Sequence, residues 1–119
     1  MAGPQHKALD TPDETRPIEK GTVEVVRLDG GAVMRTIFQP GWRWSECVKP
    51  VAGTDSCQTH HLGYCISGRM HVVMDSGEEM DVVAGDAIEI PPGHDAWVVG
   101  DEPYVGVDVT GAENYARPS

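Results

Sequence analysis

The sequence has little of several features that would assign it to a common functional class. Basic residues are few, because nine Lys and Arg stand against 19 Asp and Glu, which gives a formal net charge of -10. An acidic surface of this kind repels phosphates and anionic lipids, so neither nucleic acid nor a membrane surface is expected as a partner. No apolar run approaches the ~20 residues of a membrane-spanning helix, and the polar start MAGPQHKALD lacks a secretory core. We therefore expect a cytoplasmic protein.

Cysteines and the common catalytic motifs are also scarce. Cys47, Cys57 and Cys65 form an odd set without a secretion signal, which favours free thiols over a disulfide framework. The sequence contains no G-x-S-x-G and no G-x-G-x-x-G. Neither the nucleophile elbow of hydrolases nor a dinucleotide-binding loop is therefore expected. Thiol chemistry and metal ligation remain open.

What the sequence does contain is a series of short β-rich runs separated by turn residues. From Thr22 onward these runs are TVEVVRLD, AVMRTIF, HHLGYCI, RMHVVM, MDVV, AIEI, AWVV and YVGVDV. Gly or Pro lies in every separator, and no segment longer than a turn or two shows helical periodicity. The pattern predicts one all-β domain, a sandwich or barrel, over residues 21–119. Residues 1–20, polar and broken by three prolines, are predicted to form a tail or an extended arm that packs on an edge of the domain.

Alternation along the strands sorts the histidines and cysteines by face, because successive strand residues point to opposite sides. In HHLGYCI, His61 and Cys65 share one face and His60 lies on the other. In HDAWVV, His94 lies on the face opposite Trp97. We therefore expect His61 and His94, which come from separate strands, to meet inside the domain, whereas His60 and Trp97 face outward.

The stretch PGWRWSECVKP holds two of the three tryptophans. If this piece is extended, Trp42 and Trp44 point the same way and form a flat apolar wall with N–H donors, as ligand pockets and interfaces often use. The alternative is that both indoles fill one end of the core. Both interpretations stay open from the sequence.

A family resemblance is visible in GDAIEIPPGHDAWVV, which is similar to the second motif of the cupin superfamily, with Gly85, Pro91 and Gly93 in its glycine and proline positions. GYCISGRMHV resembles the end of the first motif, with Gly68 as its closing glycine. The resemblance covers residues 55–100 and implies the cupin double-stranded β-helix, a small jelly-roll barrel. It also implies a homodimer, since cupins often associate through sheet edges.

Metal-binding cupins carry His-x-His, a Glu and a last His at set positions around these motifs. By resemblance, the Glu position holds His61 here, and the last His position holds Ala96. The His-x-His positions fall near Asp55 and Cys57. None of the four usual ligands is in place, and the remaining candidates form a shifted, softer set: His61, His94, Cys57 and Cys65. Two imidazoles with one or two thiolates suit Zn or Cu better than a hard cation.

Three functions remain open. The first is binding of a small molecule inside the barrel, with His61 and His94 as the polar lining. Further ligand contacts in that case would be Cys65, Trp42 and Trp44. The second is a metal-dependent enzyme of the oxygenase or isomerase type, in which both histidines hold one transition-metal ion (Zn, Cu, Fe, Mn or Ni) with a cysteine or water. The third is a dimeric structural module with a filled interior, since an inward His is often only hydrogen-bonded and a free Cys only buried.

Overall fold

The computed structural model describes residues 3–110 and 115, and nearly all regular structure in this part of the chain is β-strand. Its strands are β1 Glu14–Ile18, β2 Gly21–Leu28, β3 Gly31–Phe38, β4 His61–Ser67, β5 Arg69–Met74, β6 Glu79–Val83, β7 Ala87–Ile90, β8 His94–Val98 and β9 Tyr104–Asp108. The two helices, α1 Trp44–Cys47 and α2 Lys49–Ala52, comprise about one turn each. The all-β class predicted from the short runs is confirmed.

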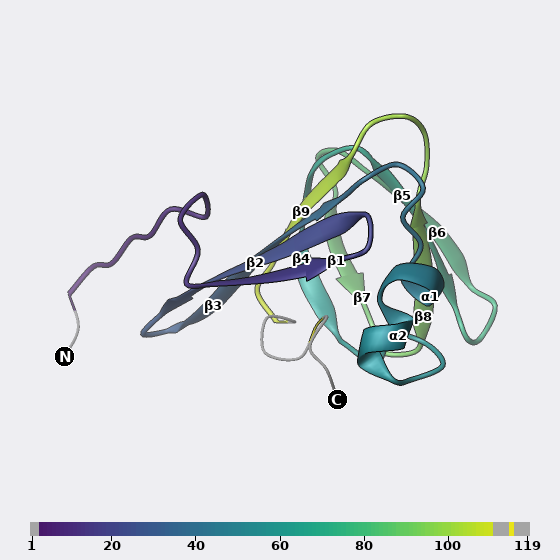
Figure 1. The fold of residues 1–119 in the computed structure, drawn as a ribbon, viewed down its shortest axis with the longest axis horizontal. Helices are drawn as coiled ribbons and strands as arrows, with labels where there is room; N and C mark the ends of the chain where they lie inside the picture. Colours follow the sequence, from purple (N-terminus) through teal and green to yellow (C-terminus); the bar gives the residue numbers. More distant parts are fainter. Residues whose placement is uncertain (1–2, 111–114, 116–119) are drawn as a thin grey trace.

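Two antiparallel sheets build the fold (Figure 1). The larger sheet has the strand order β1-β2-β3-β9-β4-β7, and the smaller has the order β6-β5-β8. This is a jelly-roll arrangement, as the sequence predicts. The barrel is not closed, however, because β6 and β7 each end a sheet and no ladder joins them in the described residues.

The side chains that face inward from both sheets form the core. Those on the strands that are buried and apolar include Val23, Val25, Met34, Phe38, Met70, Val72, Val82, Ile90, Ala96 and Val98. On β4 the alternation expected from the sequence is confirmed, because Cys65 is fully buried and His61 partly so, whereas Leu62 and Tyr64 are almost half exposed. His60 is exposed and contacts Glu89.

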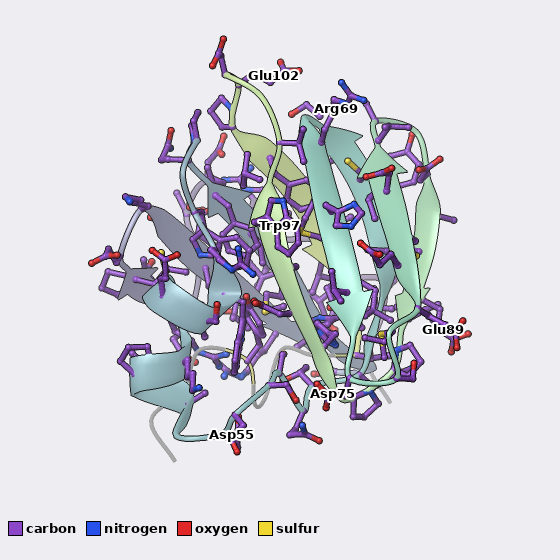
Figure 2. All side chains as sticks on the ribbon, turned by 90° about the vertical axis from the view of Figure 1, so that its right-hand side faces the viewer. Asp55, Arg69, Asp75, Glu89, Trp97 and Glu102 are labelled. Atoms are coloured by element: carbon purple, nitrogen blue, oxygen red, sulfur yellow. The ribbon has the colours of Figure 1, made fainter. Side chains whose placement is uncertain are left out.

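The smaller sheet presents Trp97 on its outer face, as Figure 2 shows. The guanidinium of Arg43 lies 4.3 Å from the centroid of this ring, and the His71 ring lies 4.9 Å from it. The outward direction predicted for Trp97 is therefore confirmed. Its partners are cationic or polar groups rather than core side chains.

Part of the predicted N-terminal arm belongs to the larger sheet. Residues 14–18 form β1, which pairs along its whole length with β2. Arg16 is only 6% exposed, donates two hydrogen bonds to the Glu14 carboxylate, and donates a third to the Tyr115 carbonyl oxygen. Glu14 also accepts from Arg27. The polar composition of this segment is compatible with a strand because its charges are paired.

The two short helices follow β3 and cover one end of the sandwich (Figure 1). Trp44 and Cys47 of α1 are buried, whereas α2 has no buried residue. The second helix ends at Gly53, which has a φ of 76°. Within the described residues, neither helix is long and apolar enough to span a membrane.

Gly63 provides a test of the close approach between β4 and β9. A Cβ at this position would lie 1.9 Å from the Val107 carbonyl oxygen, so Gly63→Ala must push the two strands apart. We expect this variant to lose about 1–3 kcal/mol of unfolding free energy in urea denaturation. Gly30→Ala is the control, because a Cβ there meets nothing within 4 Å. Equal stability of the two variants would contradict the close approach.

Glu14 should make part of the stability depend on pH. Hydrogen bonds from Arg16 and Arg27 hold the pKa of this carboxyl at about 2, below its ordinary 4.5. A carboxyl with a lowered pKa stabilises the fold above its unfolded-state pKa, and that stability is lost as pH falls from about 4.5 to about 2. Thermal unfolding of Glu14→Gln should therefore show a smaller loss of Tm across this range than the wild type. A loss of Tm in Glu14→Gln as large as that of the wild type would contradict the ion pairing. Glu102→Gln, at an exposed position, is the control.

Candidate functional site

Cys57 and His94 are placed side by side by backbone hydrogen bonds. The Cys57 N–H donates to the His94 carbonyl at 2.7 Å, and the Gly93 N–H donates to the Cys57 carbonyl at 2.7 Å. Four residues further along, His61 opens β4 in register with Ile90 of β7. The loop before β4 and the starts of β4 and β8 thus bring three chemically active side chains to one place.

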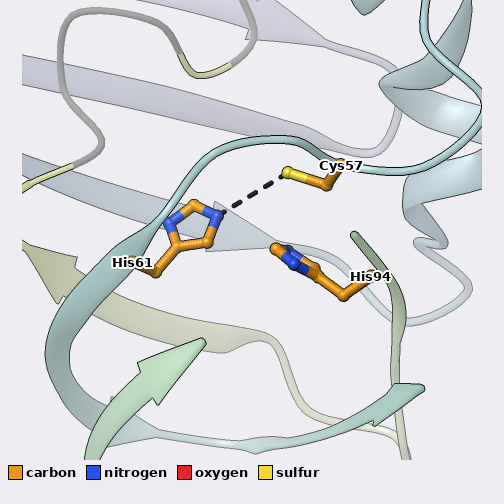
Figure 3. A group of neighbouring side chains, drawn as sticks. All are labelled: Cys57, His61 and His94. Atoms are coloured by element: carbon orange, nitrogen blue, oxygen red, sulfur yellow. Dashed lines mark hydrogen bonds between the residues drawn. The ribbon is translucent and has the colours of Figure 1, made fainter. Parts of the chain in front are cut away.

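Cys57, His61 and His94 form a compact cluster, shown in Figure 3. Each offers one ligand atom, and these atoms all lie within 4.8 Å of one another. The Cys57 Sγ lies 3.8 Å from His61 Nε2, and the two imidazole rings meet edge to face with centroids 5.3 Å apart. Cys57 and His94 are buried. The expectation that His61 and His94 meet inside the domain is confirmed.

The far nitrogens of both imidazoles are held by acceptors. His61 Nδ1 is hydrogen-bonded to the buried Asp108 carboxylate, and His94 Nδ1 lies 2.9 Å from the Pro91 carbonyl oxygen. The other Asp108 oxygen accepts from the Thr110 N–H. A ring that donates from Nδ1 keeps the lone pair of Nε2 for a metal, and metal-ligating histidines usually have such an outer contact.

The cluster contains opposite charges when no metal is present. Burial by itself raises the pKa of the Cys57 thiol, but hydrogen bonds with His61 and His94 outweigh it and lower the pKa to about 6. Burial likewise favours neutral His61, whereas Asp108 and Cys57 raise the pKa of this imidazole to about 9. Near neutral pH the cluster therefore pairs a thiolate with an imidazolium. The thiolate is the form of cysteine that ligates metals.

The donor set and its spacing fit a borderline or soft metal ion. With a Zn–S bond of about 2.3 Å and a Zn–N bond of about 2.0 Å, tetrahedral ligands S and N lie about 3.5 Å apart. The Cys57 Sγ and His61 Nε2 lie 3.8 Å apart, close to that value. Three protein ligands with a fourth position open is also the usual pattern of catalytic zinc sites. A thiolate with two imidazoles is a poor set for Ca²⁺ or Mg²⁺, which prefer oxygen ligands.

A cavity of about 50 Å³ adjoins the cluster and is lined in part by His61 and His94. Its walls are mainly apolar and aromatic, and they include Phe38, Trp42, Trp44, Tyr104 and Tyr115. A space of this size accommodates a few water molecules or one functional group of a larger molecule. The interior is therefore not completely filled, which argues against a purely structural module.

Cys65 lies outside the cluster, contrary to the prediction that it contributes to the ligand set. Its Sγ contacts the backbone carbonyls of Ser67 and Gly68, at 3.5 and 3.8 Å. The reason is distance along the strand, because four residues of β4 separate Cys65 from His61 by about 13 Å. Burial raises the pKa of the Cys65 thiol, and the residue is a core side chain.

No pattern in the sequence marks Asp108 or Tyr115 as a site residue. Asp108 lies opposite Gly63 in the β4–β9 ladder, which brings its carboxylate to His61. Nothing in the sequence indicates that its strand pairs with β4, because the two residues are 47 positions apart. The Tyr115 ring lies 5.1 Å from the His61 ring and is buried, and no local pattern marks it.

Comparison with known proteins gives structural neighbours but no sequence relatives. No family model and no curated protein matches the chain. A protein of unknown function from Acidithiobacillus ferrooxidans has a TM-score of 0.60 and 18% identity, over 83% of this chain and 88% of that one. A cupin-like protein from Thermotoga maritima has a TM-score of 0.53 and 18% identity, over 78% and 69%. Oxalate decarboxylase from Bacillus subtilis has a TM-score of 0.56 and 25% identity, over 87% of this chain but 28% of that one.

The charge state of the cluster can be tested on metal-free protein. Ultraviolet absorbance should show one thiolate that forms with an apparent pKa of about 6. Cys57→Ser should abolish this signal, and His61→Ala should move it to higher pH because the paired cation is removed. Cys47→Ser is the control, since burial raises the pKa of the Cys47 thiol. A wild-type thiolate that forms only at the ordinary pKa of 9.0 would contradict the assigned pairing.

Proposed function

The chain has the fold of the cupin superfamily, and on that premise we propose that it binds one zinc or copper ion through Cys57, His61 and His94, beside a cavity that admits a small molecule. The observation that carries the proposal is the convergence of one thiol and two imidazoles within 4.8 Å, deep in the sandwich. Three ligands leave a coordination position that a small molecule can share. The protein would thus act on, or sense, a molecule that reaches the cavity.

The residues around the cluster have separate roles in this proposal. Asp108 and the Pro91 carbonyl fix the orientation of His61 and His94 through Nδ1, which preorganises both rings. The aromatic and apolar walls keep bulk water away and lower the local dielectric, which strengthens every electrostatic contact inside. When bound, the ion supplies Lewis acidity toward an oxygen atom of the small molecule.

A second function is binding of a small molecule in the same cavity without a metal. The apolar and aromatic lining supports it, because ligand pockets combine such walls with a few polar groups. The two functions differ in one measurable property, which is whether the ion is required. If none of Zn, Cu, Fe, Mn or Ni binds, the metal-free function becomes the better account of the cavity.

Metal binding can be tested directly by elemental analysis and zinc competition on protein purified without chelators. We expect about one ion per chain in the wild type, and near-complete loss in Cys57→Ser, His61→Ala and His94→Ala. Asp108→Asn should retain the site but weaken the affinity by about 10–100-fold, because the outer contact to His61 is impaired.

The matched control for this experiment is His60→Ala. His60 is adjacent to His61 in sequence but is exposed and contacts Glu89. Its variant should keep the full metal content. Equal loss of metal in the His60 and His61 variants, or full retention in all three ligand variants, would overturn the proposed site.

A further inference from the structure

Two buried hydrogen-bond donors beside the cavity have no partner among the described residues. The Nε1 atoms of Trp42 and Trp44 are both shielded from solvent, and neither makes a hydrogen bond within the described residues. Both indoles line the cavity that His61 and His94 also line. Buried polar groups in native proteins are nearly always hydrogen-bonded, and an indole nitrogen can only donate. Two buried donors without a partner, on side chains that line one cavity, point to an acceptor from outside the described residues.

Both indole rings are held in place by the fold, so their N–H donors point in fixed directions. The Trp42 ring stacks on Phe38 with centroids 3.8 Å apart and planes within 3°. The backbone N–H of Trp42 donates a hydrogen bond to the Gln39 carbonyl oxygen, which fixes the turn before α1. Trp44 opens α1, and its carbonyl accepts from Val48. Each tryptophan is 2% exposed. The donors are thus preorganised, which reduces the ordering cost of ligand binding.

The other residues that line the cavity restrict the class of molecule that it can bind. No lysine or arginine is among the described residues that line the cavity, which disfavours a phosphate or sulfate group. A volume of about 50 Å³ suits a group of a few heavy atoms. Carboxylates and carbonyls are small organic groups whose oxygens only accept hydrogen bonds, and neither requires an arginine partner. The charge of a carboxylate would be balanced by the histidines and the ion proposed above.

We infer that the cavity binds a small molecule through a carboxylate or carbonyl oxygen that accepts hydrogen bonds from Trp42 Nε1 and Trp44 Nε1. This inference rests on the proposed function, since it names the ligand class of the same cavity. It assigns the two indoles a recognition role that packing alone does not require, because phenylalanine would fill the core without an unsatisfied donor.

Three isosteric probes test the inference on the intact chain: acetate, acetamide and acetamidinium. They share one shape, but acetate offers only acceptors, acetamide one acceptor, and acetamidinium only donors. Calorimetry and tryptophan fluorescence should show that acetate and acetamide bind and that acetamidinium does not. Binding of acetamidinium as tight as that of acetate would overturn the inference without any variant, so the test does not depend on how well a mutant folds.

Conservative variants then assign the contact to the indoles. Trp42→Phe and Trp44→Phe keep an aromatic ring but remove the N–H, and each should weaken acetate binding by about tenfold. Trp97→Phe is the matched control, because Trp97 packs on the outer face against Arg43. Unchanged acetate affinity in both cavity variants would overturn the inference.

Measurements with and without one equivalent of zinc separate this inference from the proposed function. If zinc binds through the cluster but acetate affinity is insensitive to both cavity tryptophans, the inference fails and the metal site stands. If zinc does not bind but acetate affinity falls in both tryptophan variants, the metal site fails and the inference stands.

Discussion

The candidate site depends on the backbone hydrogen bonds that join Cys57 to the start of β8. This short bridge lies outside the regular ladders and ties the loop before β4 to the smaller sheet. Without this bridge, the loop would not hold the Cys57 thiol at a fixed distance from either histidine. Because the larger sheet positions His61 and the smaller one positions His94, the cluster is built across both layers of the sandwich. Its geometry is therefore coupled to the packing of the two sheets.

Electrostatics gives the second constraint on the site. A buried charge is costly unless it is paired, and the cluster satisfies this by placing the thiolate of Cys57, the ring of His61 and the carboxylate of Asp108 in one row. Binding of a cation would replace the proton on His61 and keep the thiolate paired. The acidic surface of the chain, with a net charge of -10, also favours the approach of cations over anions.

The likeness to cupins bears on fold more than on chemistry. The neighbours share 18–25% identity with this chain, and the four usual cupin ligands are absent from their positions. The proposed site instead uses a cysteine from the loop before β4, a histidine that by resemblance holds the Glu position, and a histidine at the start of β8. A jelly roll tolerates such a shift because several strand ends converge on one interior, and any of them can supply a ligand.

The sequence by itself determined the strand runs, their turns and the inward direction of His61 and His94, because alternation and the glycine and proline positions are local properties of the chain. Its candidate ligand set included Cys65, which lies outside the cluster, and it did not show that residues 14–18 of the arm form a strand at the edge of the larger sheet. Only the tertiary structure decided that Cys57 rather than Cys65 joins the histidines, that Asp108 contacts His61, and that both indole donors lack a partner among the described residues. Each of these depends on strand register and sheet packing between segments distant in sequence, which no local pattern specifies.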